Sequence, residues 1–323
     1  MTVSQETLST AAARLASVRE SVHRFVVGQD AVVDEALAAF LARGHVLLEG
    51  VPGTAKTLLV RALGAALGMR FGRIQFTPDL MPSDITGVSV LRDASRGFEF
   101  RPGPLFTDFL LADEINRAPA KTQSALLEAM AERQATVDGT VHGLGPLFSV
   151  FATQNPVEHE GTYPLPAAQL DRFLIKTVVP YPSQTEELAM LDRYAQGFDS
   201  ERFAEMAPQA VLDANACAEL RAVVDGVRVA PEIQAYIAAI VRATREDSAL
   251  TLGASPRASV ALFRVSRAQA VIAGRDFVTP DDVKDLALPV LRHRVAVAPE
   301  LEVEGRTADQ VLEGVLDRTE APK

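Results

Sequence analysis

The stretch that decides the fold is Gly50-Val51-Pro52-Gly53-Thr54-Ala55-Lys56-Thr57. It follows an apolar run, residues 45–49, that predicts a buried strand, and it opens a helical pattern that extends to Leu67. A glycine-rich turn between strand and helix presents backbone N–H groups to phosphates, and the helix N-terminus adds favourable partial charge. We therefore predict a nucleotide-binding loop that reaches Leu58. In it Lys56 pairs with the β- and γ-phosphates, and the Thr57 hydroxyl coordinates Mg²⁺.

One position of this loop, Ala55, usually holds glycine. Alanine replaces glycine without strain only where φ is negative, so we expect a negative φ at Ala55. The alternative interpretation is a glycine-rich turn with an incidental lysine. The motif that follows next in the chain argues against that alternative.

Paired acids follow a second apolar run. Residues 109–112 predict a strand, and Asp113 and Glu114 come directly after it. In an α/β sheet the carboxyl ends of the strands form the crevice that binds ligands. We expect Asp113 to hold Mg²⁺, directly or through water, and Glu114 to polarise the water that attacks the γ-phosphate. After a third run, Asn155 either reaches the γ-phosphate or opens an Asn-Pro turn.

The succession of apolar runs predicts the fold class. Strand-like runs at residues 71–76, 109–112, 147–153 and 173–179 alternate with helical patterns, which indicates an α/β fold with a largely parallel sheet. Beyond Pro182 the strand patterns largely stop. Helical patterns follow near residues 184–196, 213–224, 231–246, 256–273 and 280–293. We therefore predict a nucleotide-binding core over residues 1–182 and a smaller all-α domain over residues 183–323.

Capping residues predict where several helices begin. Asp30 is a candidate N-cap for a helix that follows a first helix within residues 1–25. Ser183-Gln184-Thr185-Glu186 has the form of a capping box. Thr279-Pro280 opens another helix, with proline at the first helical position.

Composition limits the class of protein. The 323 residues are 48% apolar and 23% charged, within the range of globular domains. The net charge of −10 argues against a nucleic-acid partner, which usually requires a basic surface. The single cysteine, Cys217, permits no intrachain disulfide, and neither a signal peptide nor an apolar run of membrane-spanning length is present. We expect a cytoplasmic protein without a membrane span.

Together these motifs resemble the AAA+ ATPases, and more narrowly their MoxR branch. Alanine within Glu49-Gly50-Val51-Pro52-Gly53-Thr54-Ala55-Lys56-Thr57 is typical of that branch, and the resemblance covers roughly residues 25 to 295. The other motifs that carry it are Asp113-Glu114-Ile115-Asn116-Arg117-Ala118-Pro119, Ala152-Thr153-Gln154-Asn155-Pro156, Leu170-Asp171-Arg172-Phe173 and Gly253-Ala254-Ser255-Pro256-Arg257-Ala258. The resemblance implies a Mg²⁺-dependent ATPase with an AAA+ core and a helical lid domain.

The resemblance also implies roles for single residues. Asn155 is similar to the first sensor of the γ-phosphate, and Arg257 is similar to a lid arginine that reaches the nucleotide of its own subunit. Arg172 resembles an arginine that enters the site of a neighbouring subunit, although Arg117 competes for that role. The adenine is expected against Val27 and Gln29, which lie in a segment similar to the family's adenine-packing loop.

Two insertions resemble the hairpins of related ring ATPases. One pairs residues 88–91 with residues 98–101 across a polar turn, and the other spans residues 135–147 with Asp138-Gly139 as its turn. In one interpretation these hairpins face the central pore of a ring or a client protein. In the other they only extend the sheet. One departure from the family is Ala167, where relatives often have glutamate.

Three functions remain open at this stage. The first is an oligomeric, hexameric ring ATPase that remodels a protein partner as a chaperone does, with a von Willebrand A-domain protein as the partner that the resemblance implies. The second is a nucleic-acid motor of the helicase or clamp-loader kind, which the acidic charge and the 6% aromatic content disfavour. The third is a nucleotide switch with low turnover.

Overall fold

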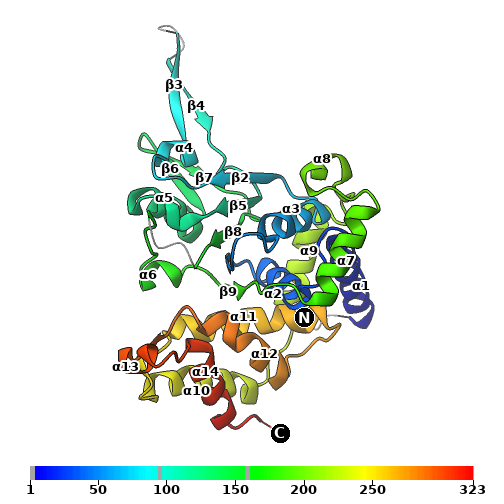
Figure 1. The fold of residues 1–323 in the computed structure, drawn as a ribbon, viewed down its shortest axis with the longest axis vertical. Coiled ribbons are helices and arrows are strands. Elements are labelled where there is room, and N and C mark those ends of the chain that lie inside the picture. Colours follow the sequence, from blue (N-terminus) through cyan, green and yellow to red (C-terminus); the bar gives the residue numbers. More distant parts are fainter. Residues whose placement is uncertain (1–3, 94–96, 157–160, 323) are drawn as a thin grey trace.

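The centre of the computed structural model, which describes residues 4–93, 97–156 and 161–322, is a five-stranded sheet (Figure 1). Its strand order is β2-β5-β8-β1-β9, and every pair of neighbours is parallel. The strands are β1 Val46–Glu49, β2 Phe71–Gln75, β5 Phe109–Asp113, β8 Ser149–Gln154 and β9 Ile175–Val178. Each overlaps a run that predicts a strand, so the α/β fold with a parallel sheet is confirmed.

Helices cover both faces of this sheet. Successive residues of a strand point to opposite sides, so one strand contributes side chains to the apolar clusters on both faces. In β5, Phe109 and Leu111 join the apolar cluster that contains α2 and α3, whereas Leu110 and Ala112 join the cluster that contains α5. The helices of this part are α1 Gln5–His23, α2 Asp30–Leu41, α3 Lys56–Ala66, α4 Pro82–Thr86, η1 Ile115–Arg117, α5 Ala120–Glu132 and α6 Ala167–Leu170.

The second part of the chain is helical except for one short antiparallel pair of strands. Its elements are α7 Gln184–Ala195, η2 Ser200–Arg202, α8 Phe203–Met206, α9 Ala214–Asp225, α10 Pro231–Glu246, β10 Leu250–Leu252, α11 Pro256–Ile272, α12 Pro280–Leu291, β11 Ala296–Val297, α13 Pro299–Val303 and α14 Ala308–Arg318. Helix α11 lies against α2, and the buried side chains of Leu262 and Leu37 belong to one apolar cluster. The helical part is therefore packed on the body of the protein and not joined to it by a linker alone.

Two of the three predicted helix starts are correct. The hydroxyl of Ser183 accepts from the backbone N–H of Glu186, and the Thr279 hydroxyl accepts from that of Asp282, so both helices begin with a capping box. Asp30 is instead the first residue of α2, and the N-cap is Gln29 with φ of 60°. Because Asp30 is already helical it is not the cap, and its carboxylate lies 3.0 Å from His23 Nε2.

Both predicted hairpins are present. Strand β3, Gly87–Asp93, pairs with β4, Gly97–Pro102, although the polar turn at residues 94–96 lies outside the described residues. This hairpin extends away from the body (Figure 1). Strand β6, Gln134–Val137, pairs with β7, Thr140–Gly143, and the positive φ angles of Asp138 and Gly139 are those of a tight primed turn.

Two further observations concern the whole described chain. Cys217, in α9, is fully buried, and burial raises the pKa of its thiol to about 12. Among the described residues, no helix combines the length and the apolar character that crossing a bilayer requires.

Candidate functional site

The glycine-rich loop connects β1 to α3, as predicted. The ammonium group of Lys56 donates to the carbonyls of Gly50 and Val51 at 2.7 Å each. Burial lowers the pKa of Lys56, and the nearby carboxylates of Asp113 and Glu114 oppose that shift. The lysine therefore lies folded into the loop, between backbone carbonyls and the two acids.

The backbone at Ala55 contradicts the expected negative φ. Ala55 has φ of 60° and ψ of 20°, in the left-handed region, and is the N-cap of α3. A single non-glycine residue there costs roughly 1–2 kcal/mol. The loop and helix on either side fix this conformation, and the buried hydroxyl of Thr54 holds the turn by donating to the Val51 carbonyl at 2.9 Å. The strain is therefore local to the position next to Lys56.

Asp113, at the end of β5, is 8% exposed and is held from three sides. The hydroxyl of Thr153 donates to Oδ1 at 2.7 Å, and a guanidinium N–H of Arg73 donates to Oδ2 at 2.7 Å. The Thr57 hydroxyl lies 3.4 Å from the same Oδ2. Carboxylate and hydroxyl oxygens are ligands that Mg²⁺ prefers, so this pair fits the predicted metal position.

Glu114 is oriented by neighbours on both sides. Gln75 Nε2 donates to its Oε2 at 2.7 Å, and Arg117 Nη1 lies 3.0 Å from the same oxygen. The backbone N–H of Glu114 donates to the Thr153 hydroxyl at 2.8 Å. One threonine therefore contacts the carboxylate of Asp113 and the backbone of Glu114, which holds the two acidic residues together at the end of β5.

These groups line one cavity of about 530 Å³. Its polar end contains the loop and both acids, and its other end is apolar, with aliphatic and aromatic side chains. The cavity brings together the following predicted residues: Val27, Gln29, Pro52, Gly53, Thr54, Ala55, Lys56, Thr57, Leu58, Asp113, Glu114 and Asn155. Gly50 and Val51 belong to the same loop but not to the cavity lining, and their carbonyls accept from Lys56.

Two buried polar atoms of the cavity wall have no partner among the described residues. Gln29 Nε2 donates to the carbonyl of Thr54 at 3.1 Å, which leaves Gln29 Oε1 buried without a donor. Arg193 Nη1, from α7, is buried without an acceptor. Buried groups of this kind are costly unless a ligand satisfies them. An acceptor and a donor near the apolar end fit the polar edge of a nucleotide.

Several residues of the cavity were not predicted from the sequence. Arg73 and Gln75 come from β2, where they lie two positions apart and so share one face. They contact the acids because β2 is the neighbour of β5, with Gln75 opposite Asp113. Met190, Arg193 and Tyr194 come from α7. The sequence of β2 does show that Arg73 and Gln75 lie on the same face of the strand. It does not show which strand lies beside β2, and so it could not predict that these side chains contact the acids.

The two predicted sensor and finger arginines lie outside the cavity lining. Arg172 Nη1 donates to the carbonyl of Leu127 at 2.7 Å, and the side chain of Arg257 is 76% exposed. Arg257 Nη1 lies 3.6 Å from Asp171, the residue before Arg172. The buried Arg294 also pairs with Asp171, at 2.7 Å. This contact fixes the helical part on the Arg172 side of the core.

The fold and the site define a class of protein. A parallel sheet whose strand β1 leads through a lysine-containing loop into a helix, with paired acids after β5, is the architecture of a P-loop ATPase. The comparisons with known proteins agree. Residues 45–175 match the model of the ATPase family associated with various cellular activities (AAA), and residues 242–315 match the AAA lid domain.

Relatives narrow this class. Chaperone MoxR1 of Mycobacterium tuberculosis is 42% identical over 313 residues, which cover 94% of this chain and 81% of the relative. Uncharacterized protein YeaC of Bacillus subtilis is 46% identical over 303 residues, 94% of this chain and 93% of the relative. A crystal structure from Cytophaga hutchinsonii, described as an ATPase, superimposes with a TM-score of 0.89 at 39% identity, with 98% of each chain covered. The chain belongs to the MoxR family of AAA+ ATPases and is an ATP-hydrolysing enzyme.

Proposed function

We propose that this ATPase requires Mg²⁺, works as a homo-oligomeric ring of six subunits, and remodels or assembles a protein partner in the manner of a chaperone. The observation that carries the ring is the position of Arg172 and Arg257. Both arginines lie outside the cavity of their own chain, and both are close to Asp171. Arg73, which does line the cavity, is already paired with Asp113, so a neighbouring subunit is expected to supply the arginine that neutralises charge at the γ-phosphate.

Within one subunit the residues divide the work of hydrolysis. Lys56 pairs with the β- and γ-phosphates, and Asn155 contacts the γ-phosphate or the attacking water. Glu114 orients that water and accepts its proton while the bond to the leaving ADP breaks, which yields ADP and inorganic phosphate. The Gln75 contact at 2.7 Å supports this role because it holds the carboxylate in one orientation.

The residues that would hold Mg²⁺ are Thr57 and Asp113. The metal ion would supply positive charge that offsets the negative charge of the nucleotide phosphates. Among the described residues, no three His, Cys, Asp or Glu side chains gather into a group that suits a metal ion. Binding at this position therefore relies on the nucleotide phosphates as well as on the two protein oxygens. Arg73 contacts the same oxygen of Asp113, so it has to yield or share that oxygen when Mg²⁺ binds.

Both exposed arginines serve the neighbouring subunit in this proposal. Arg117 already pairs with Glu114 of its own chain, which favours Arg172 for the finger role. Arg257 is expected to act beside Arg172 and not on its own nucleotide, because Arg294 fixes the helical part to Asp171. We propose that residues 1–182 form the nucleotide-binding core and that residues 183–323 form the lid.

The hairpin β3–β4 is the proposed contact with the protein partner. Its exposed apolar side chains include Leu91 at 55% and Phe98 at 75%, and these two residues are opposite each other in the pairing register. Exposed apolar groups that share one face of a projecting hairpin are typical of a protein-binding surface. A von Willebrand A-domain protein is the partner class that we propose.

The test is the ATPase rate against protein concentration, with Mg²⁺, for wild type and for three variants. Glu114→Gln should bind ATP without turnover. Arg172→Ala and Lys56→Ala should each be inactive, yet their mixture should regain activity, because mixed rings contain some sites with both an intact lysine and a neighbour's arginine. Arg228→Ala is the control: Arg228 is 62% exposed and pairs with Asp276 in the helical part. A mixture no more active than its components would overturn the shared site.

A further inference from the structure

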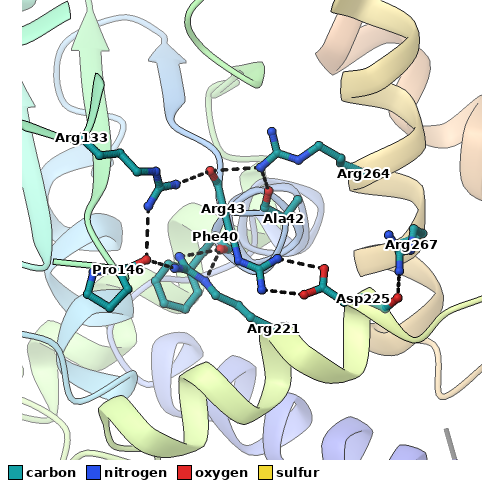
Figure 2. Close-up of polar contacts among 9 residues, drawn as sticks. All are labelled: Phe40, Ala42, Arg43, Arg133, Pro146, Arg221, Asp225, Arg264 and Arg267. Carbon is teal, nitrogen blue, oxygen red and sulfur yellow. Dashed lines mark hydrogen bonds and ion pairs between the residues drawn. The ribbon is translucent and has the colours of Figure 1, made fainter. Parts of the chain in front are cut away.

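Five arginines gather near the amino ends of strands β1 and β8, whereas the nucleotide cavity lies at the carboxyl ends of the strands. This arginine cluster consists of Arg43, Arg133, Arg221, Arg264 and Arg267 (Figure 2). Arg43 lies between α2 and β1, Arg133 follows α5, Arg221 is in α9, and Arg264 and Arg267 are one turn apart in α11. Strands β1 and β8 begin beside the cluster, whereas the nucleotide loop follows the carboxyl end of β1. The cluster is therefore a separate location from the candidate active site.

Arg221 forms the buried base of the cluster and is 2% exposed. Its guanidinium donates twice to the carbonyl of Phe40, at 3.1 and 2.8 Å, and once to that of Pro146, at 2.8 Å. It also lies 4.4 Å above the ring of Phe40. These contacts satisfy Arg221 and cap the carboxyl end of α2. Its guanidinium also donates to the Ser149 hydroxyl at 3.2 Å, and among the described residues no carboxylate pairs with it.

Arg133 and Arg264 converge on the next carbonyl groups of the same turn. Figure 2 shows them reaching the carbonyl of Arg43 from opposite sides, at 3.0 and 3.3 Å. Arg264 also donates to the carbonyl of Ala42. Arg133 belongs to the core and Arg264 to the helical part, so the cluster lies in the seam between the two parts.

The charge of the cluster is unbalanced. Among the described residues that contact it, Asp225 is the one carboxylate, and Arg43 occupies both of its oxygens, at 2.9 and 2.7 Å. Within the described part of the chain, Arg267 donates only to the Asp225 carbonyl. Burial, and after it the repulsion among the guanidinium groups, lowers the pKa of Arg221 to about 9, and the pKa of Arg264 is lowered for the same two reasons. Five positive groups therefore share one negative group in a chain whose net charge is −10.

Unused donors remain in this seam. Arg264 uses only Nη2, and its Nε and Nη1 donate to no acceptor within residues 4–93, 97–156 and 161–322. The same holds for Nη1 of Arg267, whose Nε is moreover buried without a partner. Guanidinium forks match the oxygens of phosphate in geometry and charge. A seam between packed helices admits a compact ion more readily than an extended polyanion.

We propose that the arginine cluster binds an oxyanion of the phosphate class, donated to by Arg264 and Arg267, in the seam between the core and the helical part. A doubly charged anion offsets the unbalanced charge and uses the free N–H groups. The anion is either free phosphate or the phosphoryl group of a small phosphate monoester, which share this chemistry. Bound there, it ties α11 to the carboxyl end of α2 and should stabilise the folded chain.

The experiment follows thermal unfolding by far-UV circular dichroism while inorganic phosphate replaces chloride at constant ionic strength. It is done in the Lys56→Ala background, so that phosphate at the nucleotide loop contributes little. Arg264→Gln and Arg267→Gln should each weaken the apparent phosphate affinity roughly tenfold, which corresponds to about 1.4 kcal/mol. Asp225→Asn removes the repelling carboxylate and should leave the affinity unchanged or increase it. Arg14→Gln, which removes an exposed arginine paired with Glu219, is the matched control.

Four outcomes decide the question, two against the proposal and two for it. An unchanged phosphate response in both arginine variants would overturn the proposal, as would equal stabilisation by acetate, which carries a single charge. If Arg264→Gln does not fold, Arg267→Gln decides alone, since Arg267 makes one hydrogen bond, to a carbonyl. Stabilisation by β-glycerophosphate as strong as that by phosphate supports the proposal with a monoester as the ligand. Stabilisation by phosphate alone supports it with the free ion.

Discussion

His45 should contribute strongly to the change of stability with pH. Its side chain lies between α5 and β8 and is 5% exposed. Its Nδ1 accepts from the backbone N–H of Val150 at 3.0 Å, so Nε2 carries the proton and donates to the carbonyl of Met130 at 3.2 Å. Burial lowers the pKa of His45 to about 3. A second proton would break the bond to Val150, so the folded protein keeps this imidazole neutral.

The sign and size of the effect follow from proton linkage. Between the folded pKa of about 3 and the unfolded pKa near 6.5, the unfolded chain binds a proton at His45 that the folded chain does not. The free energy of unfolding therefore falls as the pH falls below about 6.5. Between pH values of about 7.5 and 5.8 the loss is about 1 kcal/mol for His45. Burial also lowers the pKa of His293, so this residue should add a loss of the same sign.

The assay is urea unfolding followed by far-UV circular dichroism, because the chain has no tryptophan. A pH of about 5.8 stays above the isoelectric point near 5.1 and so limits aggregation. His45→Gln retains one donor and one acceptor but does not titrate. It should be less stable at both pH values, yet the difference between the two should shrink by about 1 kcal/mol. The same pH difference in wild type and variant would refute the assignment.

Three further predictions concern the candidate active site. Ala55→Gly removes the Cβ atom from a backbone with φ of 60° and should raise the free energy of unfolding by about 0.5 kcal/mol, measured by urea unfolding. The nucleotide affinity, measured by calorimetry, should be retained. A less stable variant would show that the backbone at Ala55 is not strained. Gln75→Leu frees Glu114 and should lower kcat on the order of tenfold while the Kd for ATP stays constant, and an unchanged kcat would remove Gln75 from the site. Arg193→Gln should weaken ATP and ADP binding alike by roughly tenfold, because the variant lacks the buried guanidinium N–H that would donate to the nucleotide. Calorimetric titration checks this, and equal affinities would show that the arginine faces no ligand.

Local patterns in the sequence predicted the elements that carry the chemistry. Apolar runs located β5, β8 and β1 because strands buried on both faces have few polar residues, whereas the edge strands β2 and β9 carry polar residues as well. Asp138-Gly139 marked a hairpin because tight primed turns need two residues with positive φ. Lys56 and Thr57 were predicted because a glycine-rich loop leads into a helix there, and Asp113 and Glu114 because they stand at the end of an apolar strand.

Properties that depend on the tertiary arrangement were not predictable in this way. Gln75 and Glu114 are 39 residues apart and meet only because β2 lies beside β5. The position of Arg257 depends on the pairing of Arg294 with Asp171, which are 123 residues apart. Ala55 keeps a positive φ because its surroundings outweigh its intrinsic preference.

One omission had an available local signal. Helix α14 begins with a capping box, in which the Thr307 hydroxyl accepts from the backbone N–H of Gln310. Its buried residues Val311, Leu312, Val315 and Leu316 follow helical spacing. The preceding segment, which includes the exposed α13, is rich in charge, and this concealed the start of the apolar pattern.

The single, buried cysteine makes the chain convenient for spectroscopy. The thiol of Cys217 is enclosed near the carbonyl of Leu67 and stays protonated at neutral pH, so it should not react with maleimide reagents. Phe98→Cys in the projecting hairpin and Val303→Cys in α13, at positions 75% and 90% exposed, would then be the reactive thiols. A donor and acceptor dye on these two positions would report, molecule by molecule, how the hairpin moves relative to the lid during turnover.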